Sequence, residues 1–353
     1  MSKTVYIFSV ALEHTTAHYF ERAIKSFPGW HCSYVGAGFD LSILDPDDIF
    51  LYVDPAPDWP VGLETVPCLT VAYLIDVHQD LTSRVQMSKF FDVVFLAQKD
   101  YLRYFPHVLG SQLHWLPLGC APDIHKRTSP KRDYDVGFVG KLGAEGSRRY
   151  EFLTSVLQRY KTNAYTQYYS PDQIGEVYGR SKIVFNVSIS GDLNMRFFEA
   201  MCAGALLITD RIENGLPELF REDVHYVAYS SLPEAFQKIN KYLVDDAARL
   251  RISQFAQKAA IKGHTYSHRW QYVSERLATA EKNACARTLS VEALAELYSD
   301  IFVSLRKPKA FGAIFKRYAV NARVIRLFLM AACRKLNSCV PLTPNAIRAR
   351  NWF

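Results

Sequence analysis

The sequence has 353 residues, of which 49% are hydrophobic and 22% are charged, a composition typical of a folded protein rather than a disordered or fibrous one. A chain of this length can form two domains with substantial cores. Its formal charge of +7 is unevenly distributed, because residues 306–353 contain eleven Lys or Arg and no Asp or Glu. The preceding part carries 31 basic against 35 acidic side chains, so the C-terminal tail is a separate electrostatic segment.

The cysteines and the hydropathy pattern exclude several classes of protein. Seven cysteines are scattered singly without a CxxC pair, which indicates neither a zinc site nor a disulfide framework. The N-terminus has no long apolar region with a small-residue cleavage site, and no stretch of about 18 uncharged apolar residues occurs. We therefore expect a cytoplasmic protein with reduced cysteines.

The first third of the chain alternates apolar segments with amphipathic ones. Continuous apolar strands separated by helices predict a parallel sheet covered on both faces, the Rossmann-like architecture, for residues 1–120. The turn after the first expected strand contains no Gly-x-Gly-x-x-Gly, which argues against a dinucleotide-dependent dehydrogenase. Strands are expected at 5–12, 32–35, 49–53, 67–76, 93–97 and 114–118, with a helix at 18–27.

Polar side chains follow several of these strands. Ligands of doubly wound sheets bind beyond the carboxyl ends of the strands, where we expect His14, Asp54, Asp76 and His78. Each of them alone is also explained as a helix cap or a turn residue. Asp76 and His78 are the better catalytic candidates, because a carboxylate with a nearby imidazole can take the proton from an acceptor hydroxyl.

A change of composition precedes a second domain. Residues 121–133 are rich in turn-forming and charged side chains, and we interpret them as the interdomain linker. The second domain is expected at 134–283, and its first strand ends at Gly140 and Lys141, shortly before two arginines at a helix start. Glycine permits close backbone approach and basic side chains neutralise phosphate, so Gly140 and Lys141 are candidates for binding a diphosphate.

The second domain repeats the alternation of strands and helices. Further strands are expected at 163–168, 182–188, 205–209 and 225–229. The expected helices lie at 149–160, 171–179, 195–203, 213–220, 232–243 and 247–262, and another begins within 264–270.

The segment from Ser188 to Asp210 is predicted as a loop, a helix and a buried strand. Asn194 is a favourable N-cap, strong helix formers follow it, and a glycine suits the C-terminal end. Arg196 and Glu199 are three positions apart, so they share a face close to the positive end of the helix, where an anion binds favourably. The alternative is a surface salt bridge on an ordinary crossover helix.

This segment resembles the signature region of the CgeB-like branch of the group 1 glycosyltransferases, in which Asn-Met-Arg-x-Phe-Glu-Ala precedes a small-residue turn and an apolar strand ending in Thr-Asp. The resemblance spans Asp45–Arg276 and is dense over Tyr134–Trp270. It implies the GT-B fold, in which two Rossmann-like domains face a central cleft. This sequence departs from the wider superfamily at Gly191, where relatives carry an acidic residue, and Asp192 follows it.

The resemblance also implies a function. A glycosyltransferase of this kind moves a sugar from a nucleotide-sugar donor to a glycan, lipid-linked or protein acceptor, in the assembly of cell-surface polysaccharides or glycoconjugates. Glu199 is expected to hold the donor ribose, Asn194 and Arg196 to face the diphosphate, and Tyr169 to lie near the nucleobase. No cofactor or metal is expected, since fixed cations and helix dipoles take the place of a metal. The alternatives are a nucleotide-sugar epimerase on the same fold and a non-catalytic surface-assembly scaffold.

Residues 284–353 are expected to form a helical extension with a basic amphipathic end. A helix is predicted at 287–305, and beyond it apolar and aromatic residues recur at helical spacing opposite Lys and Arg. Such a helix suits the inner face of an anionic membrane or a second subunit, and the alternative is packing on the acidic body of the protein. Nucleic-acid binding is not expected, because the rest of the chain is net acidic and carries no RNA or DNA motif.

Overall fold

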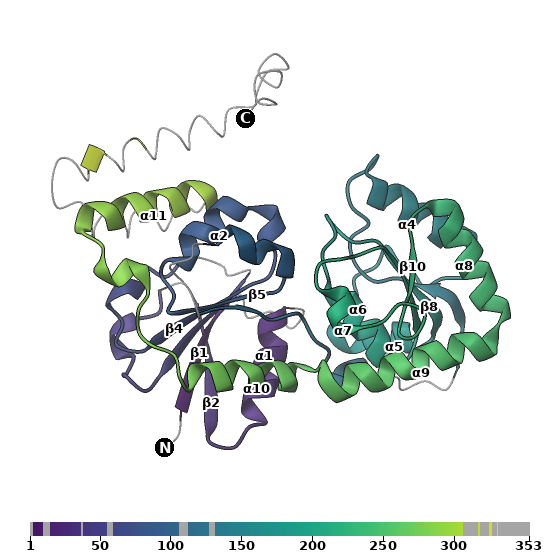
Figure 1. Ribbon diagram of the computed structural model, residues 1–353, viewed down its shortest axis with the longest axis horizontal. Coiled ribbons are helices and arrows are strands. Elements are labelled where there is room, and N and C mark those ends of the chain that lie inside the picture. Colours follow the sequence, from purple (N-terminus) through teal and green to yellow (C-terminus); the bar gives the residue numbers. More distant parts are fainter. Residues whose placement is uncertain are drawn as a thin grey trace, which may run out of the picture.

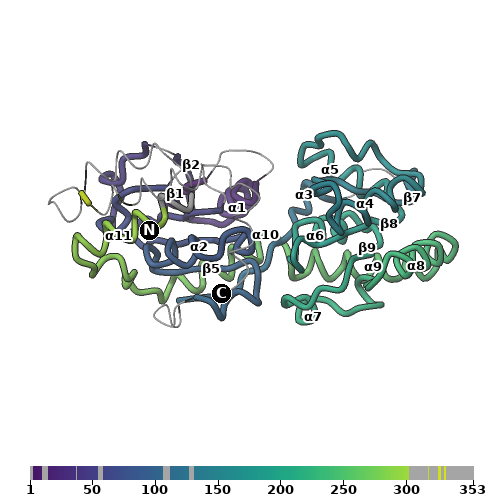
Figure 2. Tube along the Cα trace, turned by 90° about the horizontal axis from the view of Figure 1, so that it is seen from above, coloured from purple at the N-terminus to yellow at the C-terminus, as the bar shows by residue number. Residues whose placement is uncertain are grey.

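The computed structural model describes residues 3–9, 15–36, 38–54, 59–105, 112–126 and 131–305, together with residues 317, 325, 326 and 330. Two α/β units lie side by side in it, as Figure 1 and the view from above in Figure 2 show. Each unit is built on its own parallel sheet, the first from strands before the expected linker and the second from strands after it. The chain therefore forms the predicted pair of Rossmann-like domains.

The first sheet has six strands in the order β2-β1-β3-β4-β5-β6, all of them parallel. Its central strands are almost entirely apolar, as expected for a sheet that helices cover on both faces. Leu51 and Tyr73 pack on one face with helices α1 and α10, whereas Phe50 and Leu74 pack on the other with α2 and α11. The strands are β1 (Lys3–Phe8), β2 (Trp30–Val35), β3 (Ile49–Val53), β4 (Leu69–Leu74), β5 (Val93–Leu96) and β6 (Leu113–Trp115).

The helices of the first domain are shorter and more irregular than those of the second. Asp80 caps α2 through a bond that its side chain accepts from the amide of Ser83. The α-helices are α1 (Thr16–Lys25), α2 (Leu81–Ser88) and, in the linker, α3 (Pro122–His125). The 3-10 helices are η1 (Leu41–Ile43), η2 (Leu63–Thr65), η3 (Val77–Gln79) and η4 (Lys99–Tyr104).

The second sheet has four parallel strands in the order β10-β9-β8-β7, and helices cover both of its faces. The helix α6 follows β8 and packs against α9 and α5, which places its first turn at the carboxyl edge of the sheet. The strands are β7 (Tyr134–Gly137), β8 (Ser181–Asn186), β9 (Leu206–Asp210) and β10 (Val227–Tyr229). The helices are α4 (Arg148–Arg159), α5 (Pro171–Gly179), α6 (Met195–Cys202), α7 (Leu216–Leu219), α8 (Leu232–Val244) and α9 (Asp246–Gly263).

The chain crosses between the domains twice, and the two crossings pair with each other. The amide of Cys120 donates to the carbonyl of His264 over 3.0 Å, and the amide of Tyr266 donates to the carbonyl of Cys120 over 2.9 Å. The helix α10 (Tyr266–Leu277) then packs beneath the first domain beside α1 (Figure 1). The guanidinium of Arg269 donates to the carbonyls that precede the linker. The segment that begins at His264 thus connects the two domains through backbone and side-chain hydrogen bonds.

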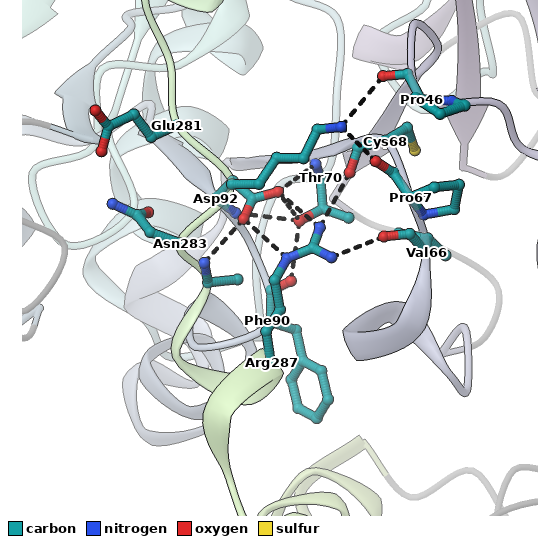
Figure 3. Close-up of polar contacts among 12 residues, drawn as sticks. Pro46, Val66, Pro67, Cys68, Thr70, Phe90, Asp92, Glu281, Asn283 and Arg287 are labelled. Carbon is teal, nitrogen blue, oxygen red and sulfur yellow. Dashed lines mark hydrogen bonds and ion pairs between the residues drawn. The ribbon is translucent and has the colours of Figure 1, made fainter.

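After the second crossing, the chain continues on the first domain through η6 (Cys285–Thr288) and α11 (Val291–Leu305), which packs beside α2. Figure 3 shows the polar anchor of this segment around the buried carboxylate of Asp92. Asp92 accepts bonds from the amide and hydroxyl of Thr70, from the amide of Ala284, and from the guanidinium of Arg287 at 2.9 and 3.1 Å. The body of the first domain therefore includes residues from both ends of the described chain.

Most predicted elements agree with the structure, but residues 163–168 form a turn rather than a strand. The side-chain amide of Asn163 takes the place of strand pairing, because it donates to the carbonyl of Phe138 and accepts from the amide of Phe138. The helix predicted at 287–305 begins at Val291, after the 3-10 helix η6. The amphipathic pattern predicted beyond residue 305, and His14, lie outside the described residues apart from a few isolated positions.

Candidate active site

A cleft of about 460 Å³ lies between the carboxyl edges of the two sheets and is lined by both domains. The first domain contributes the ends of β3 and β4, the start of α1 and Gln98. The second contributes the loop after β7, the start of α6 and side chains from α4 and α5. Seven of the eight predicted site residues line this cleft: Asp76, His78, Gly140, Lys141, Asn194, Arg196 and Glu199.

Arg196 and Glu199 are both buried in the wall that the second domain presents to the cleft. A surface salt bridge, the alternative left open by the sequence, is therefore wrong. Burial raises the pKa of Glu199 to about 7, and the charge of Arg196 opposes this shift. The carboxyl group of Glu199 thus sits close to half ionisation near neutral pH.

The guanidinium of Arg196 is held by neutral oxygen atoms. It donates to the carbonyl of Val139 over 2.6 and 3.2 Å and to the side-chain oxygen of Asn186 over 2.6 Å. Its carbon lies 4.4 Å from the ring centre of Phe138, a cation–π contact. Because none of these partners carries a negative charge, Arg196 presents a fixed positive charge to the cleft.

Arg149 supplies a second fixed charge, from the helix start that follows Gly140 and Lys141 in the sequence. Its guanidinium donates to the carbonyls of Val187 and Lys141, the latter over 2.9 and 3.2 Å. Burial and the neighbouring charge of Arg196 lower the pKa of Arg149 to about 10, so it stays protonated at neutral pH. The side chain of Lys141 itself is exposed at the rim of the cleft. The helix start with two arginines was the available signal for this residue.

The N-terminus of α6 opens onto the cleft, but Asn194 does not cap it as predicted. Its side-chain amide donates to Asn186 over 3.2 Å instead, so the expected cap bond is absent. Among the residues that the structure describes, its side-chain oxygen has no hydrogen-bond partner and is buried. Asn194 itself lines the cleft.

The loop before α6 carries the departure from the superfamily pattern. Gly191 has a φ of 75°, and Ser190 before it has a φ of 55°, so the chain turns sharply here through left-handed conformations. Asp192 is buried in the cleft wall and accepts a bond from the amide of Ile189. Burial, the largest influence, raises the pKa of Asp192.

In the first domain, Asp76 and His78 both line the cleft, but they do not form the hydrogen-bonded pair that a catalytic dyad needs. Within the described part of the chain, both ring nitrogens of His78 are buried and have no hydrogen-bond partner. Burial and the nearby carboxylate of Asp54 raise the pKa of Asp76. Asp54 is paired with Arg84 over 3.0 Å, whereas Asp76 has no ion pair with any residue that the structure describes.

The remaining predicted residue, Tyr169, is not among the residues that line the cleft. Its hydroxyl donates to the carbonyl of Ala164 and accepts from Asn163, both over 3.3 Å. These contacts belong to the turn at 163–168 and give Tyr169 a structural partner of its own.

A direct contact between the domains closes one side of the cleft. The side-chain oxygen of Gln98 accepts from the amide of Leu193 over 3.1 Å and from the side chain of Asn214 over 2.6 Å. The amide of Asp100 donates to Asn214 over 3.0 Å. The loop that leads into α6 is therefore docked against the first domain.

The second domain matches a known protein family. Residues 127–275 match the family model described as glycosyl transferase-like. The match covers the linker end, the second sheet and most of α10, which is less than half of the chain. No curated protein matches this sequence.

Solved structures match both domains. HepE of Anabaena, solved with UDP and glucose, superposes with a TM-score of 0.59 and 12% identity over 79% of this chain and 100% of HepE. Sucrose-phosphate synthase of Thermosynechococcus elongatus superposes with a TM-score of 0.54 and 10% identity over 79% of this chain and 99% of the synthase. A glycosyltransferase of Rickettsia africae superposes with a TM-score of 0.51 and 12% identity over 78% of this chain and 97% of the glycosyltransferase. The fold is GT-B, as predicted.

Two further properties of the described residues concern metal binding and membrane-spanning helices. No group of three or more His, Cys, Asp or Glu side chains lies close enough together in this part of the chain to hold a metal ion. None of its helices combines the length and apolar character needed to span a membrane.

Proposed function

We propose that the protein is a nucleotide-sugar-dependent glycosyltransferase of the CgeB-like type. The observation that carries this proposal is the second-domain wall of the cleft, where the buried Glu199 and Arg196 and the half-buried Arg149 surround the open N-terminus of α6. This wall offers an acceptor for sugar hydroxyls beside two fixed positive charges. A nucleoside diphosphate carries the complementary groups, a ribose and a diphosphate.

The donor would bind to the second domain. In this proposal Glu199 accepts hydrogen bonds from the ribose, and Arg149, Arg196 and the amides at the start of α6 face the diphosphate. Negative charge develops on the diphosphate as the sugar leaves, so these groups stabilise the transition state more than the ground state. We propose that these cations, and not a metal ion, neutralise the leaving group, and that Asn194 and Asp192 replace the acidic residue missing at Gly191 in holding the sugar.

The acceptor would bind to the first domain. Asp76 lines the cleft from this side, and its raised pKa suits it to take a proton from an acceptor hydroxyl in an inverting reaction. A role for His78 in binding the acceptor requires its ring, whose nitrogens are buried and unpaired within the described residues, to turn toward the cleft. A retaining reaction needs no such base, so the stereochemical outcome decides the role of Asp76. We propose a glycan, lipid-linked or protein acceptor in cell-surface polysaccharide or glycoconjugate assembly on the cytoplasmic side of the membrane.

The test is a donor assay on wild type and on Glu199→Ala, with UDP-, GDP-, TDP- and CMP-sugars, scored for binding, hydrolysis and epimerisation. Glu176→Ala is the matched control, because Glu176 is an exposed carboxylate on the neighbouring helix α5. We expect wild type and the control to bind and slowly hydrolyse one donor, and Glu199→Ala to lose most of this binding. Absence of binding and turnover with every donor would overturn the proposal, and epimerised donor without acceptor would replace it with an epimerase.

A further inference from the structure

His125 is a fully buried residue of the linker at which both domains meet. Its backbone rests on α5 at Gly175, where a Cβ would lie 2.9 Å from the Cα of His125. Its ring packs edge-on against Tyr19 of α1, with ring centres 5.2 Å apart, and one ring nitrogen faces Glu199 of α6. The first domain, the linker and the second domain therefore all contact one imidazole.

The hydrogen bonds of His125 define which ring nitrogen carries the proton. The amide of Ala121 donates to Nδ1 over 3.1 Å, so Nδ1 is an acceptor. Burial lowers the pKa of His125 to about 4, so the ring is neutral at physiological pH. The single ring proton must then lie on Nε2, which is 3.3 Å from Oη of Tyr19 and 3.7 Å from Oε1 of Glu199.

Several titratable side chains other than His125 surround the carboxylate of Glu199. Those that act on or with Glu199 are Arg196 on α6, Tyr19 on α1, Tyr178 on α5 and Tyr266 on α10. Burial raises the pKa of all three phenols well above the physiological range, so they stay neutral. The charge of Arg196 then favours the ionised carboxylate, and the Nε2–H of His125 faces the same carboxylate from 3.7 Å.

We infer that His125 is a positioning residue for Glu199: its Nε2–H, fixed by the bond from Ala121, orients the carboxylate toward the cleft and favours its ionised form. The hydrogen bond of Nε2 is with Oη of Tyr19, and at 3.7 Å the contact of the ring with the carboxylate is electrostatic. The inference rests on the proposed function in one respect, namely that the oriented carboxylate receives the ribose of the donor. Because His125 belongs to the linker, it also ties the geometry of the donor site to the position of the first domain.

The experiment uses two substitutions that separate the two ring nitrogens. His125→Asn keeps an oxygen acceptor for the amide of Ala121 but is too short to place an N–H at Glu199. His125→Gln reaches the position of Nε2 with an amide N–H. The first readout is the carboxyl titration of Glu199 in ligand-free protein, followed by carbon NMR of labelled glutamate and assigned with Glu199→Gln. The second is the affinity for UDP, GDP and TDP from pH 5.5 to 8.5, with thermal unfolding as a check on folding.

We expect His125→Asn to move the Glu199 titration up by about half a pH unit or more, and to weaken binding of the nucleoside diphosphate at pH 7 about threefold or more. His125→Gln should restore both values toward wild type. An unchanged titration in folded His125→Asn protein, or equal shifts in both variants, would overturn the inference. If wild type binds none of the three nucleotides, the proposed function and the ribose part of the inference fail. The ligand-free titration then still decides whether His125 acts on Glu199.

Discussion

A Cβ on Gly140 would lie 2.6 Å from Nη2 of Arg196, so the guanidinium occupies the space that any other residue would fill. Gly140 also has a φ of 133°, a conformation that glycine adopts at little cost. The position of the Arg196 guanidinium therefore depends on the absence of a side chain at Gly140. The sequence pointed to both residues for phosphate binding, but the contact between them is visible only in the fold.

Gly140→Ala is expected to displace Arg196 and to lower donor turnover about 100-fold, since misplacement of a group at the reacting centre by 1 Å has an effect of that order. Gly146→Ala is the matched control, because Gly146 also has a positive φ, 76°, but open space around its Cβ position. Kinetics with the donor identified for wild type check this prediction. Equal losses in both variants would show that backbone strain, and not the contact with Arg196, matters at Gly140.

Arg149→Met is expected to reduce kcat for sugar transfer about 100-fold, because it removes one of the two charges that face the proposed diphosphate. Arg149→Lys should recover little, since one ammonium cannot reproduce the bonds of the guanidinium to the carbonyls of Lys141 and Val187. Arg159→Gln serves as control, because Arg159 is exposed in the last turn of the same helix. Steady-state kinetics with and without EDTA check both the charge and the proposed independence from metal. Full activity of Arg149→Met would contradict the assignment.

How much of this site the sequence predicts depends on how local each signal is. Arg196 and Glu199 were predicted together because their spacing on one helix fixes their common face. His125 was not, because it reaches the site through a contact with Glu199, which is distant in sequence. Local periodicity carries no information about such contacts.

The errors have equally specific causes. Residues 163–168 were predicted as a strand, but the side chain of Asn163 bonds the backbone of Phe138, directly after β7, and the chain turns. Asn194 has a cap sequence and the backbone of a cap, yet its side chain is drawn to Asn186. In both cases a tertiary hydrogen bond of an asparagine side chain overrides a local preference.

Arg287→Met is expected to destabilise the protein by about 3 kcal/mol or more, because it leaves the carboxylate of Asp92 buried without its charged partner. Lys282→Met is the control: Lys282 is exposed and donates only to backbone carbonyls of the first domain, so its loss is expected to have an effect below about 1 kcal/mol. Chemical unfolding checks the difference. Adding Asp92→Asn to Arg287→Met should recover part of the stability, and failure to do so would argue against a charge effect.

Deletion of residues 309–353 is expected to reduce co-sedimentation with anionic vesicles, because it removes nine of the eleven basic residues of the tail. Each basic residue near such a surface contributes on the order of 1 kcal/mol. Neutral vesicles and high salt are the controls, since both should weaken binding of the complete chain. Unchanged co-sedimentation of the shortened protein with anionic vesicles would contradict attachment through the tail.

Glu199→Gln is expected to stabilise the protein at high pH while impairing donor binding. The pKa of Glu199 rises from an ordinary value of 4.5 to about 7 on burial, so the folded state holds this proton more tightly than the unfolded state. The stability that the wild-type protein has below pH 4.5 is therefore lost progressively as the pH rises through 7, by up to about 3 kcal/mol. Glutamine carries no such proton, so the two proteins should be equally stable near pH 4.5 and should diverge toward pH 8.

Donor affinity should have the opposite pH dependence in wild type. Ribose hydroxyls donate to the ionised carboxylate, so binding should weaken as the pH falls through 7, and this dependence should vanish in Glu199→Gln. Thermal unfolding and calorimetric titration across pH 5 to 8 measure both effects. A wild-type affinity that is constant over this range would remove Glu199 from the ribose site, whereas a constant stability difference would show that its carboxyl group is not the buried acid described here. If both expected results are found, the ionised carboxylate of Glu199 destabilises the fold at neutral pH and is also required for donor binding.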